Sequence, residues 1–184
     1  PPTVVHVSNF RPIKRVPWLV RAFARASEGL DARLVLVGDG PEHAATRAVV
    51  RELGIGSRVL FLGERDALPE LLAPADVFAL SSSDESFGLS ALEAMACGTS
   101  VVATDVGGVS EVVAHGECGL LAPLDDLAAF AGHLRALLVD RARALSMGRR
   151  AREIAVERFA RDSVVLEYES LYLRTLSATP WPFP

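Results

Sequence analysis

The chain is poor in residues that would tie it to an oxidising compartment or a membrane. It has two cysteines among 184 residues, Cys97 and Cys118, and both lie in apolar stretches without the spacing of a disulfide framework. No apolar run approaches the roughly 18 residues that span a bilayer, and nothing near Pro1 resembles a signal peptide. We therefore expect a cytoplasmic protein. Because the chain opens without methionine, we also expect further residues before Pro1.

Lysine is almost absent. Lys14 is the single lysine beside 18 arginines, and codon composition explains this preference for arginine. The formal net charge is −4. A chain of this charge lacks the basic face with which general nucleic-acid binders neutralise phosphates. The four histidines show no metal-ligand spacing with one another or with the cysteines, so we expect core or surface histidines and no bound metal.

Apolar residues are plentiful. Half of the residues are hydrophobic and the mean hydropathy is +0.28, which predicts a large core. Short apolar runs bounded by turn residues alternate with segments of helical period. The expected strands span residues 3–8, 32–37, 58–62, 76–80, 100–103 and 119–121. The expected helices span residues 17–28, 41–53, 68–72, 89–97, 108–114, 125–139, 141–159 and 163–176.

Continuous apolar strands separated by helices predict an α/β fold with a doubly wound parallel sheet, because a parallel sheet is buried on both faces. Additional helices follow the last strand. We expect one domain over residues 1–176 and a tail over 177–184. In such sheets ligands bind beyond the carboxyl ends of the strands. The candidate site therefore comprises the loops after residues Ser8, Val37, Leu62, Leu80 and Ala103.

The loop and helix with the sequence SDESFGLSALEAMAC are the most informative segment. Gly88 lets the backbone approach a ligand closely, and the N–H groups of Phe87, Gly88 and Leu89 open a helix, where an anionic group binds. Glu85 precedes this turn. Glu93, eight residues further on, is the one charge in an apolar helix. Burying it unpaired would be costly, and the hydroxyls of a sugar or ribose would be suitable partners.

A second interpretation of the two glutamates stays open. Taken alone, Glu85 is equally a solvated loop residue with a favourable charge at a helix start, and Glu93 the polar edge of an amphipathic helix. The complete pattern of loop, glycine, helix start and spaced carboxylates favours a ligand site.

ESFGLSALEAMACG resembles the Glu-x7-Glu signature of glycosyltransferase family 4, retaining enzymes with the two Rossmann-like domains of the GT-B fold. The flanks SVVATDVGGVSEVVAHGECGLLAP and ARLVLVGDGPE are similar to those around the signature in that family. The resemblance implies that the chain is the Rossmann-like, C-terminal, donor-binding half of a GT-B fold. It assigns the donor sugar to Glu85 and the nucleotide ribose to Glu93. Sugar and phosphate contacts fall on the turn formed by Ser86, Phe87, Gly88 and Leu89.

The segment SNFRPIKR follows the first expected strand. Arg11 and Lys14 stand three apart in a loop held by Pro12, and a guanidinium fork with an ammonium suits a diphosphate. A solvated basic loop is the alternative. Many family members have their phosphate-binding arginine at the position of Asn9, which we count among the donor-binding residues. The Arg-x-x-Lys arrangement resembles one branch of the family, which joins N-acetylglucosamine to L-malate at the start of bacillithiol biosynthesis.

The resemblance implies a retaining hexosyl transfer from a nucleotide-diphosphate sugar, UDP-N-acetylglucosamine in that branch. The leaving diphosphate would be stabilised by Arg11, Lys14 and helix-start amides, and the sugar oriented by Glu85, which makes these three side chains the predicted catalytic residues. No metal or other cofactor is expected. The acceptor would lie on an N-terminal domain absent from this chain, so we expect the chain alone to bind donor weakly without turnover.

Two other functions stay open. A nucleotide-sugar epimerase on the same fold would isomerise the sugar without an acceptor, and a non-catalytic sugar-nucleotide-binding or partner-binding module would not need Glu85 and Lys14.

Weaker signals are a tight turn at GDGP, a glycine pair at 107–108 that approaches a ligand or serves packing, and the pair 64–65 at the place of the family's base-binding loop. The helix expected over 163–176 corresponds to the family's terminal helix, which packs toward the other domain.

Overall fold

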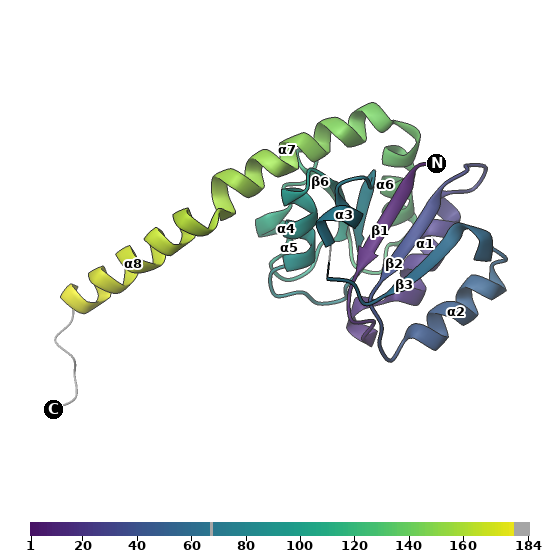
Figure 1. The fold of residues 1–184 in the computed structure, drawn as a ribbon, viewed down its shortest axis with the longest axis horizontal. Coiled ribbons are helices and arrows are strands. Elements are labelled where there is room, and N and C mark those ends of the chain that lie inside the picture. The colour runs from purple at the N-terminus through teal and green to yellow at the C-terminus, as the bar shows by residue number, and fades with distance from the viewer. Residues whose placement is uncertain (67, 179–184) are drawn as a thin grey trace.

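Six parallel strands form one sheet in the order β3-β2-β1-β4-β5-β6 (Figure 1). The computed structural model describes residues 1–66 and 68–178. The strand order reverses between β1 and β4, which is the switch point at which doubly wound sheets bind their ligands. The predicted doubly wound parallel sheet is thus confirmed. Its strands are β1 (Thr3–Val7), β2 (Arg33–Val37), β3 (Val59–Gly63), β4 (Val77–Leu80), β5 (Ser100–Thr104) and β6 (Gly119–Ala122).

Helices connect the strands and continue after β6. Every predicted helix is present, with ends that coincide or shift by a few residues. A short 3₁₀ turn, η1 (Pro12–Lys14), follows β1, and a second, η2 (Gly56–Arg58), precedes β3. The α-helices are α1 (Val16–Ala26), α2 (His43–Glu52), α3 (Leu68–Leu72), α4 (Leu89–Ala96), α5 (Val109–Val112), α6 (Leu127–Val139), α7 (Arg141–Phe159) and α8 (Arg161–Ala178).

The helix expected over 41–53 begins two residues later than predicted. Its N-cap is Glu42, whose N–H donates to Phe10 O at 2.9 Å, and the N–H of His43 donates to Gly40 O at 3.0 Å. These bonds make residues 40–43 a tight turn fastened to the loop after β1, so Pro41 lies in the turn and not in the first turn of the helix. The interpretation of GDGP as a turn is confirmed.

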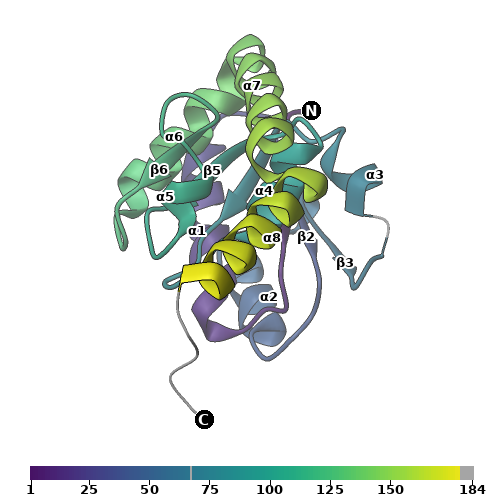
Figure 2. The same ribbon diagram turned by 90° about the vertical axis from the view of Figure 1, so that its left-hand side faces the viewer.

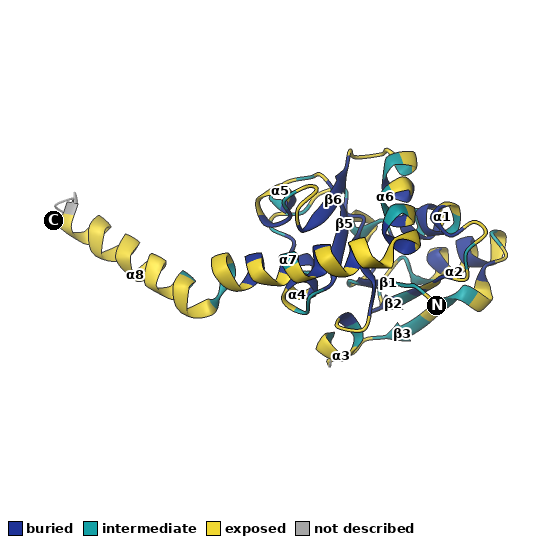
Figure 3. Ribbon diagram, turned by 90° about the horizontal axis from the view of Figure 1, so that it is seen from above, coloured by how far each residue is buried: buried dark blue, intermediate teal, exposed yellow. Residues whose placement is uncertain are grey.

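Two apolar clusters lie on opposite faces of the sheet, because successive strand residues point to opposite sides. Val4 and Leu36 belong to the cluster under α1, α2 and α6, whereas Val5 and Phe78 belong to the cluster under α4, α5 and α7. Figure 3 shows β5 and β6 in the colour of buried residues, whereas the edge strand β3 is only partly buried. This double burial holds the carboxyl ends of β1 and β4 in a fixed position, from which the candidate site extends.

Helix α8 leads away from the sheet (Figures 1 and 2). Apart from the half-buried Val164, its side chains over residues 161–177 are exposed, and large apolar ones such as Leu166, Tyr172, Leu173 and Leu176 are among them. Neither core cluster includes a residue of this helix. Over residues 1–66 and 68–178, no helix combines the length and the apolar character needed to cross a membrane.

Candidate functional site

Lys14 and Glu85, two of the three predicted catalytic residues, meet at the switch point of the sheet. Lys14 Nζ donates to Glu85 Oε2 at 2.5 Å, and the two side chains are 21% and 14% exposed. The residues are 71 positions apart in the sequence. They come together because one follows β1 and the other follows β4, which are neighbours in the sheet. The ion pair lies at the edge where the fold predicts a ligand.

The segments that carry this pair are bonded to one another along their length. We call residues 8–15 the β1 loop and residues 81–88 the β4 loop. Ser81 Oγ donates to Lys14 O at 2.7 Å, and the N–H of Ser83 donates to Ile13 O at 2.8 Å. The position of the ammonium relative to the carboxylate is therefore set by the backbone as well as by the ion pair itself.

Ser82 is a site residue that the sequence analysis missed. Its hydroxyl donates to Glu85 Oε2 at 3.2 Å, and its own carbonyl accepts from Thr104 Oγ1 at 2.5 Å. Both residues are buried. Glu85 thus receives two hydrogen bonds on one oxygen, which fixes the carboxylate before a ligand arrives. The run of three serines before Asp84 was the available signal, because buried hydroxyls need partners.

The glycine pair Gly107–Gly108 serves packing against the β4 loop. The N–H of Gly108 donates to Glu85 O at 3.0 Å. A Cβ atom would lie 2.0 Å from Glu85 O at Gly107, and 2.3 Å from Ser86 O at Gly108. Side chains at either position would push the Glu85 backbone away. Of the two roles predicted for the pair, the packing role is confirmed.

Helix α4 begins at Leu89 as predicted, with Gly88 as its N-cap at φ +87°. The first N–H groups of a helix have no acceptor within the helix, so those around Gly88 lie where an anionic ligand would find donors. The half-buried Phe87 ring packs edge-on against Phe159 at the end of α7, with 5.8 Å between ring centroids. Leu89 is 66% exposed. The contacts of Ser86, Phe87, Gly88 and Leu89 with a donor stay predictions.

Glu93 is exposed, and the argument that its burial demands a partner was wrong. Helix α4 packs against the core through Ala91, Ala94 and Met95, and Glu93 lies on a different face. An exposed carboxylate needs no protein partner and is open to solvent or ligand. Its ribose-binding role stays a prediction.

The remaining predicted residues of the β1 loop, Asn9 and Arg11, are exposed, so the structure pairs Lys14 with Glu85 but does not bring Arg11 into that contact. Glu64 and Arg65, after β3, are exposed as well. For all four the expected donor contacts stay predictions.

His6 lies fully buried in β1 and is bonded at both ring nitrogens. Nδ1 is 2.8 Å from Ala79 O and Nε2 is 2.8 Å from Ser8 Oγ. Burial lowers the pKa of His6 from 6.5 to about 4, so the imidazole is neutral at pH 7. Among the described residues no three His, Cys, Asp or Glu side chains are grouped as a metal site.

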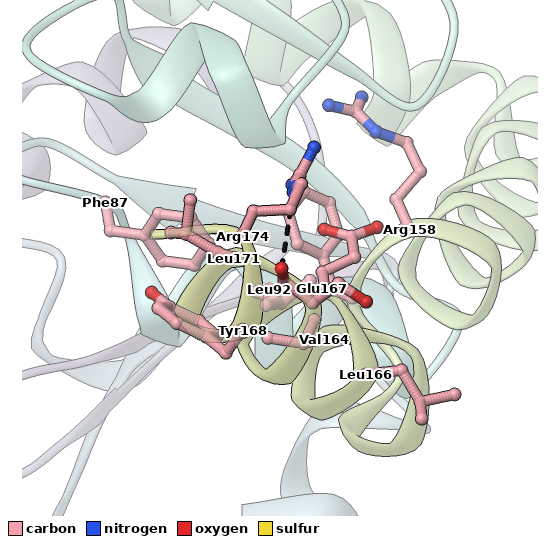
Figure 4. Close-up of a pocket in the computed structure, with 11 residues that line it drawn as sticks. Phe87, Leu92, Arg158, Val164, Leu166, Glu167, Tyr168, Leu171 and Arg174 are labelled. Carbon is pink, nitrogen blue, oxygen red and sulfur yellow. Dashed lines mark hydrogen bonds between the residues drawn. The ribbon is translucent and has the colours of Figure 1, made fainter. Parts of the chain in front are cut away.

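A groove of about 870 Å³ runs along α8 beside the candidate site. Figure 4 shows side chains of α8, among them Tyr168, Leu171 and Arg174, arranged around Phe87 and Leu92. Of the predicted site residues, Phe87 lines the groove while Lys14 and Glu85 do not. The groove and the ion pair are therefore separate features that share the start of α4.

Comparison with known proteins places this geometry in a family. The family model described as glycosyl transferases group 1 matches residues 1–140. N-acetyl-alpha-D-glucosaminyl L-malate synthase of Bacillus anthracis is 46% identical over 94% of this chain and 45% of its own length.

Solved structures agree over nearly the whole chain. Sucrose-phosphate synthase from Thermosynechococcus elongatus superposes with a TM-score of 0.86 at 35% identity, over 97% of this chain and 46% of that one. Anabaena HepE in complex with UDP-glucose gives 0.83 at 31% identity, over 96% and 49%. The chain spans about half the length of the relatives it matches. The matched fold is the C-terminal half of a GT-B architecture, and the chain belongs to the group 1 glycosyl transferases, family 4.

Proposed function

We propose that this chain is the donor-binding domain of a retaining hexosyltransferase that binds UDP-N-acetylglucosamine and transfers its sugar to L-malate. The observation that carries the proposal is the Lys14–Glu85 pair at the switch point of the sheet, beside the start of α4. The 46% identity to a synthase of N-acetylglucosaminyl malate supports the choice of sugar and acceptor. The HepE complex with UDP-glucose, on the same fold at 31% identity, supports a uridine nucleotide.

The diphosphate of the donor is assigned to Lys14, Arg11 and the amides at the start of α4. Negative charge grows on the leaving diphosphate as the bond to the anomeric carbon breaks, and preorganised cations and N–H dipoles stabilise that charge. Glu85 accepts from sugar hydroxyls and holds the ring for attack by the acceptor on the same face that the diphosphate leaves. Glu93 accepts from the ribose. The ammonium and carboxylate that bond each other in the structure would thus turn to neighbouring parts of one ligand.

These groups supply the charge that a metal would otherwise provide, so we propose transfer without a metal ion. Transfer by the full-length protein that retains its rate in excess chelator is the expected result. A rate abolished by chelator and restored by a divalent cation would contradict this part of the proposal.

The acceptor belongs, in this proposal, to an N-terminal domain outside the 184 residues. Two observations support a further domain: the chain spans about half of its relatives, and α8 presents exposed apolar side chains such as Leu166 and Leu173. The chain alone then binds donor weakly and does not turn over. A cytoplasmic location and a place in bacillithiol synthesis belong to the same proposal, and the free thiols of Cys97 and Cys118 suit a reducing compartment.

Titration of the chain with UDP, UDP-N-acetylglucosamine, UDP-glucose and GDP-mannose tests the donor site, because a ligand that binds the folded state raises the melting temperature. The largest rise is expected with UDP-N-acetylglucosamine. A larger rise with another sugar nucleotide would indicate a different donor in the same family, and no rise with any of them would refute the donor site. Formation of N-acetylglucosaminyl malate by the full-length protein tests the acceptor.

A further inference from the structure

The main-chain ladder between β1 and β4 ends early. β1 pairs with β2 along its whole length, from Thr3 to Val7, whereas its pairing with β4 comprises only Val4 with Val77 and Val5 with Phe78. No ladder pair joins the described residues of the two strands beyond that point, and the β1 and β4 loops follow from there. A contact other than the ladder has to set the distance between the loops.

His6 occupies the place where the ladder stops. Its Nδ1 is 2.8 Å from Ala79 O on β4, and its Nε2 is 2.8 Å from Ser8 Oγ, the first residue of the β1 loop. The N–H of Phe10 donates in turn to Ser8 Oγ at 3.3 Å. Phe10 has φ +42°, a left-handed conformation that is rare for a bulky residue and that turns the loop toward η1. A chain of hydrogen bonds therefore runs from β4 through His6 to this turn.

The donor and acceptor groups determine the direction of each hydrogen bond in this series. A carbonyl oxygen only accepts, so Nδ1 carries the proton that Ala79 O receives. The burial that lowers the pKa of His6 to about 4 keeps the imidazole neutral, which leaves Nε2 as an acceptor for the Ser8 hydroxyl. The Ser8 oxygen is then free to accept from Phe10. A neutral histidine is the side chain that can both donate to β4 and accept from the loop.

We propose that His6 and Ser8 are positioning residues that hold the β1 loop at a fixed distance from the β4 loop and so keep Lys14 in contact with Glu85. The bonds from Ser81 and Ser83 fix the far end of the β1 loop, at Ile13 and Lys14, and the His6–Ser8 contact fixes its near end. His6 is fully buried and acts on the loop only through Ser8. The role in donor binding rests on the function proposed above, whereas the role in holding the loops does not.

The first test is hydrogen exchange at the Ser83 amide, which donates from the β4 loop to Ile13 O on the β1 loop. Ser8→Ala is expected to speed this exchange about tenfold, the size of effect that losing one or two hydrogen bonds produces. Ser8→Thr keeps a hydroxyl and should restore slow exchange. His6→Asn places an amide donor where Nδ1 was but cannot reach Ser8, so it should match Ser8→Ala, and the double variant should be no worse than either single one.

Ser27→Ala is the control, because the Ser27 hydroxyl is also hydrogen-bonded, to Ala24 O and Arg58, but the fully buried Ser27 lies at the end of α1, away from both loops. It should lower the melting temperature and leave the exchange of Ser83 unchanged. Unchanged Ser83 exchange in folded Ser8→Ala would overturn the proposal. So would a long-range ¹H–¹⁵N spectrum of the wild-type chain at pH 7 that shows the His6 proton on Nε2.

The second test is the affinity for UDP. Ser8→Ala and His6→Asn should weaken UDP binding about tenfold, with Ser8→Thr and Ser27→Ala close to wild type. Wild-type affinity in Ser8→Ala, with Ser83 exchange accelerated, would overturn the link between loop position and binding. A wild-type chain that binds no UDP would refute the proposed function, and the exchange test would still decide whether His6 and Ser8 hold the loops.

Discussion

One oxygen of Glu85 accepts from both Lys14 Nζ and Ser82 Oγ. The pair is mostly buried, so solvent screens it less than it screens a surface ion pair. A diphosphate would compete with the carboxylate for Lys14, and sugar hydroxyls would compete with the ammonium for Glu85. Removing one partner therefore frees the other to bind a ligand. Substitution of Lys14 and substitution of Glu85 should then have different effects on UDP affinity and on sugar transfer.

Lys14→Ala should weaken binding of UDP by about 10- to 100-fold, because a charge-assisted hydrogen bond to the diphosphate is lost. Glu85→Gln should leave UDP affinity equal or higher, because it removes the competing carboxylate, while transfer by the full-length protein falls by about 100-fold or more. Isothermal titration and a transfer assay measure the two effects. Asp84→Asn, an exposed neighbour, is the control. Equal loss of UDP affinity in both variants would contradict these separate roles.

His6 makes stability depend on pH. Its pKa is about 4 in the folded chain and 6.5 in the unfolded chain, with burial as the main cause. Below pH 6.5 the unfolded state binds a proton that the folded state does not accept until about pH 4, so folding stability falls as the pH drops through this window. The loss amounts to about 3 kcal/mol. Denaturant unfolding should show that His6→Asn loses less stability than wild type between pH 7 and pH 4, and parallel profiles would contradict the assignment.

At the scale of elements, the β4 loop is held between its neighbours. The β1 loop bonds it on one side through Ser81 and Ser83, and the Gly107–Gly108 turn presses against it on the other. Such contact on two sides fixes the backbone from which the Glu85 side chain extends. A substitution in the glycine turn should therefore act at the site although the turn carries no functional side chain.

Gly107→Ala should lower the free energy of unfolding by about 2–3 kcal/mol, because φ is +52° and the new Cβ would lie 2.0 Å from Glu85 O. Gly116→Ala is the matched control: φ is +81°, yet nothing lies within 4 Å of the new Cβ. It should cost about 1 kcal/mol from backbone strain alone. Chemical denaturation measures both, and UDP titration should find weaker binding in Gly107→Ala only. An equal loss of unfolding free energy in Gly107→Ala and Gly116→Ala would show that the contact with Glu85 does not contribute to stability.

The elements themselves could be predicted from the sequence, because short apolar runs mark the strands and turn residues separate them from the helices. The position of Glu85 before a helix start could be predicted for the same reason. The Lys14–Glu85 contact could not, because it joins residues 71 positions apart and depends on β1 and β4 being neighbours. The exposure of Glu93 depends on which face of α4 packs on the core, which an apolar helix does not reveal. The turn at Pro41 depends on a bond to Phe10 in another loop.

At the scale of the whole molecule, the sheet with its two helical layers is one unit and α8 is an extension of it (Figure 3). The core clusters end with residues of α7, and over residues 161–177 only Val164 is even half-buried. A helix with so little burial gains little stability from tertiary packing. The sheet should therefore fold without it.

A chain ending after Ala160 should melt within about 3 °C of the complete chain, because less than about 1 kcal/mol of packing is lost. Scanning calorimetry measures the midpoint, and circular dichroism should confirm the loss of one helix. As a control, Leu134→Ala on α6, which is fully buried in the core, should lower the midpoint by far more. A large fall on truncation would show that α8 is part of the folding unit.

The internal pairing of Lys14 and Glu85 has a consequence for selectivity in a crowded cell. Because the two charges already pair with each other, inorganic phosphate or sulfate would have to compete with Glu85 for the ammonium and would be repelled by the carboxylate. A sugar nucleotide offers an anion to one partner and hydroxyls to the other in a single molecule. We therefore expect the ion pair to favour a sugar nucleotide over small anions at this site.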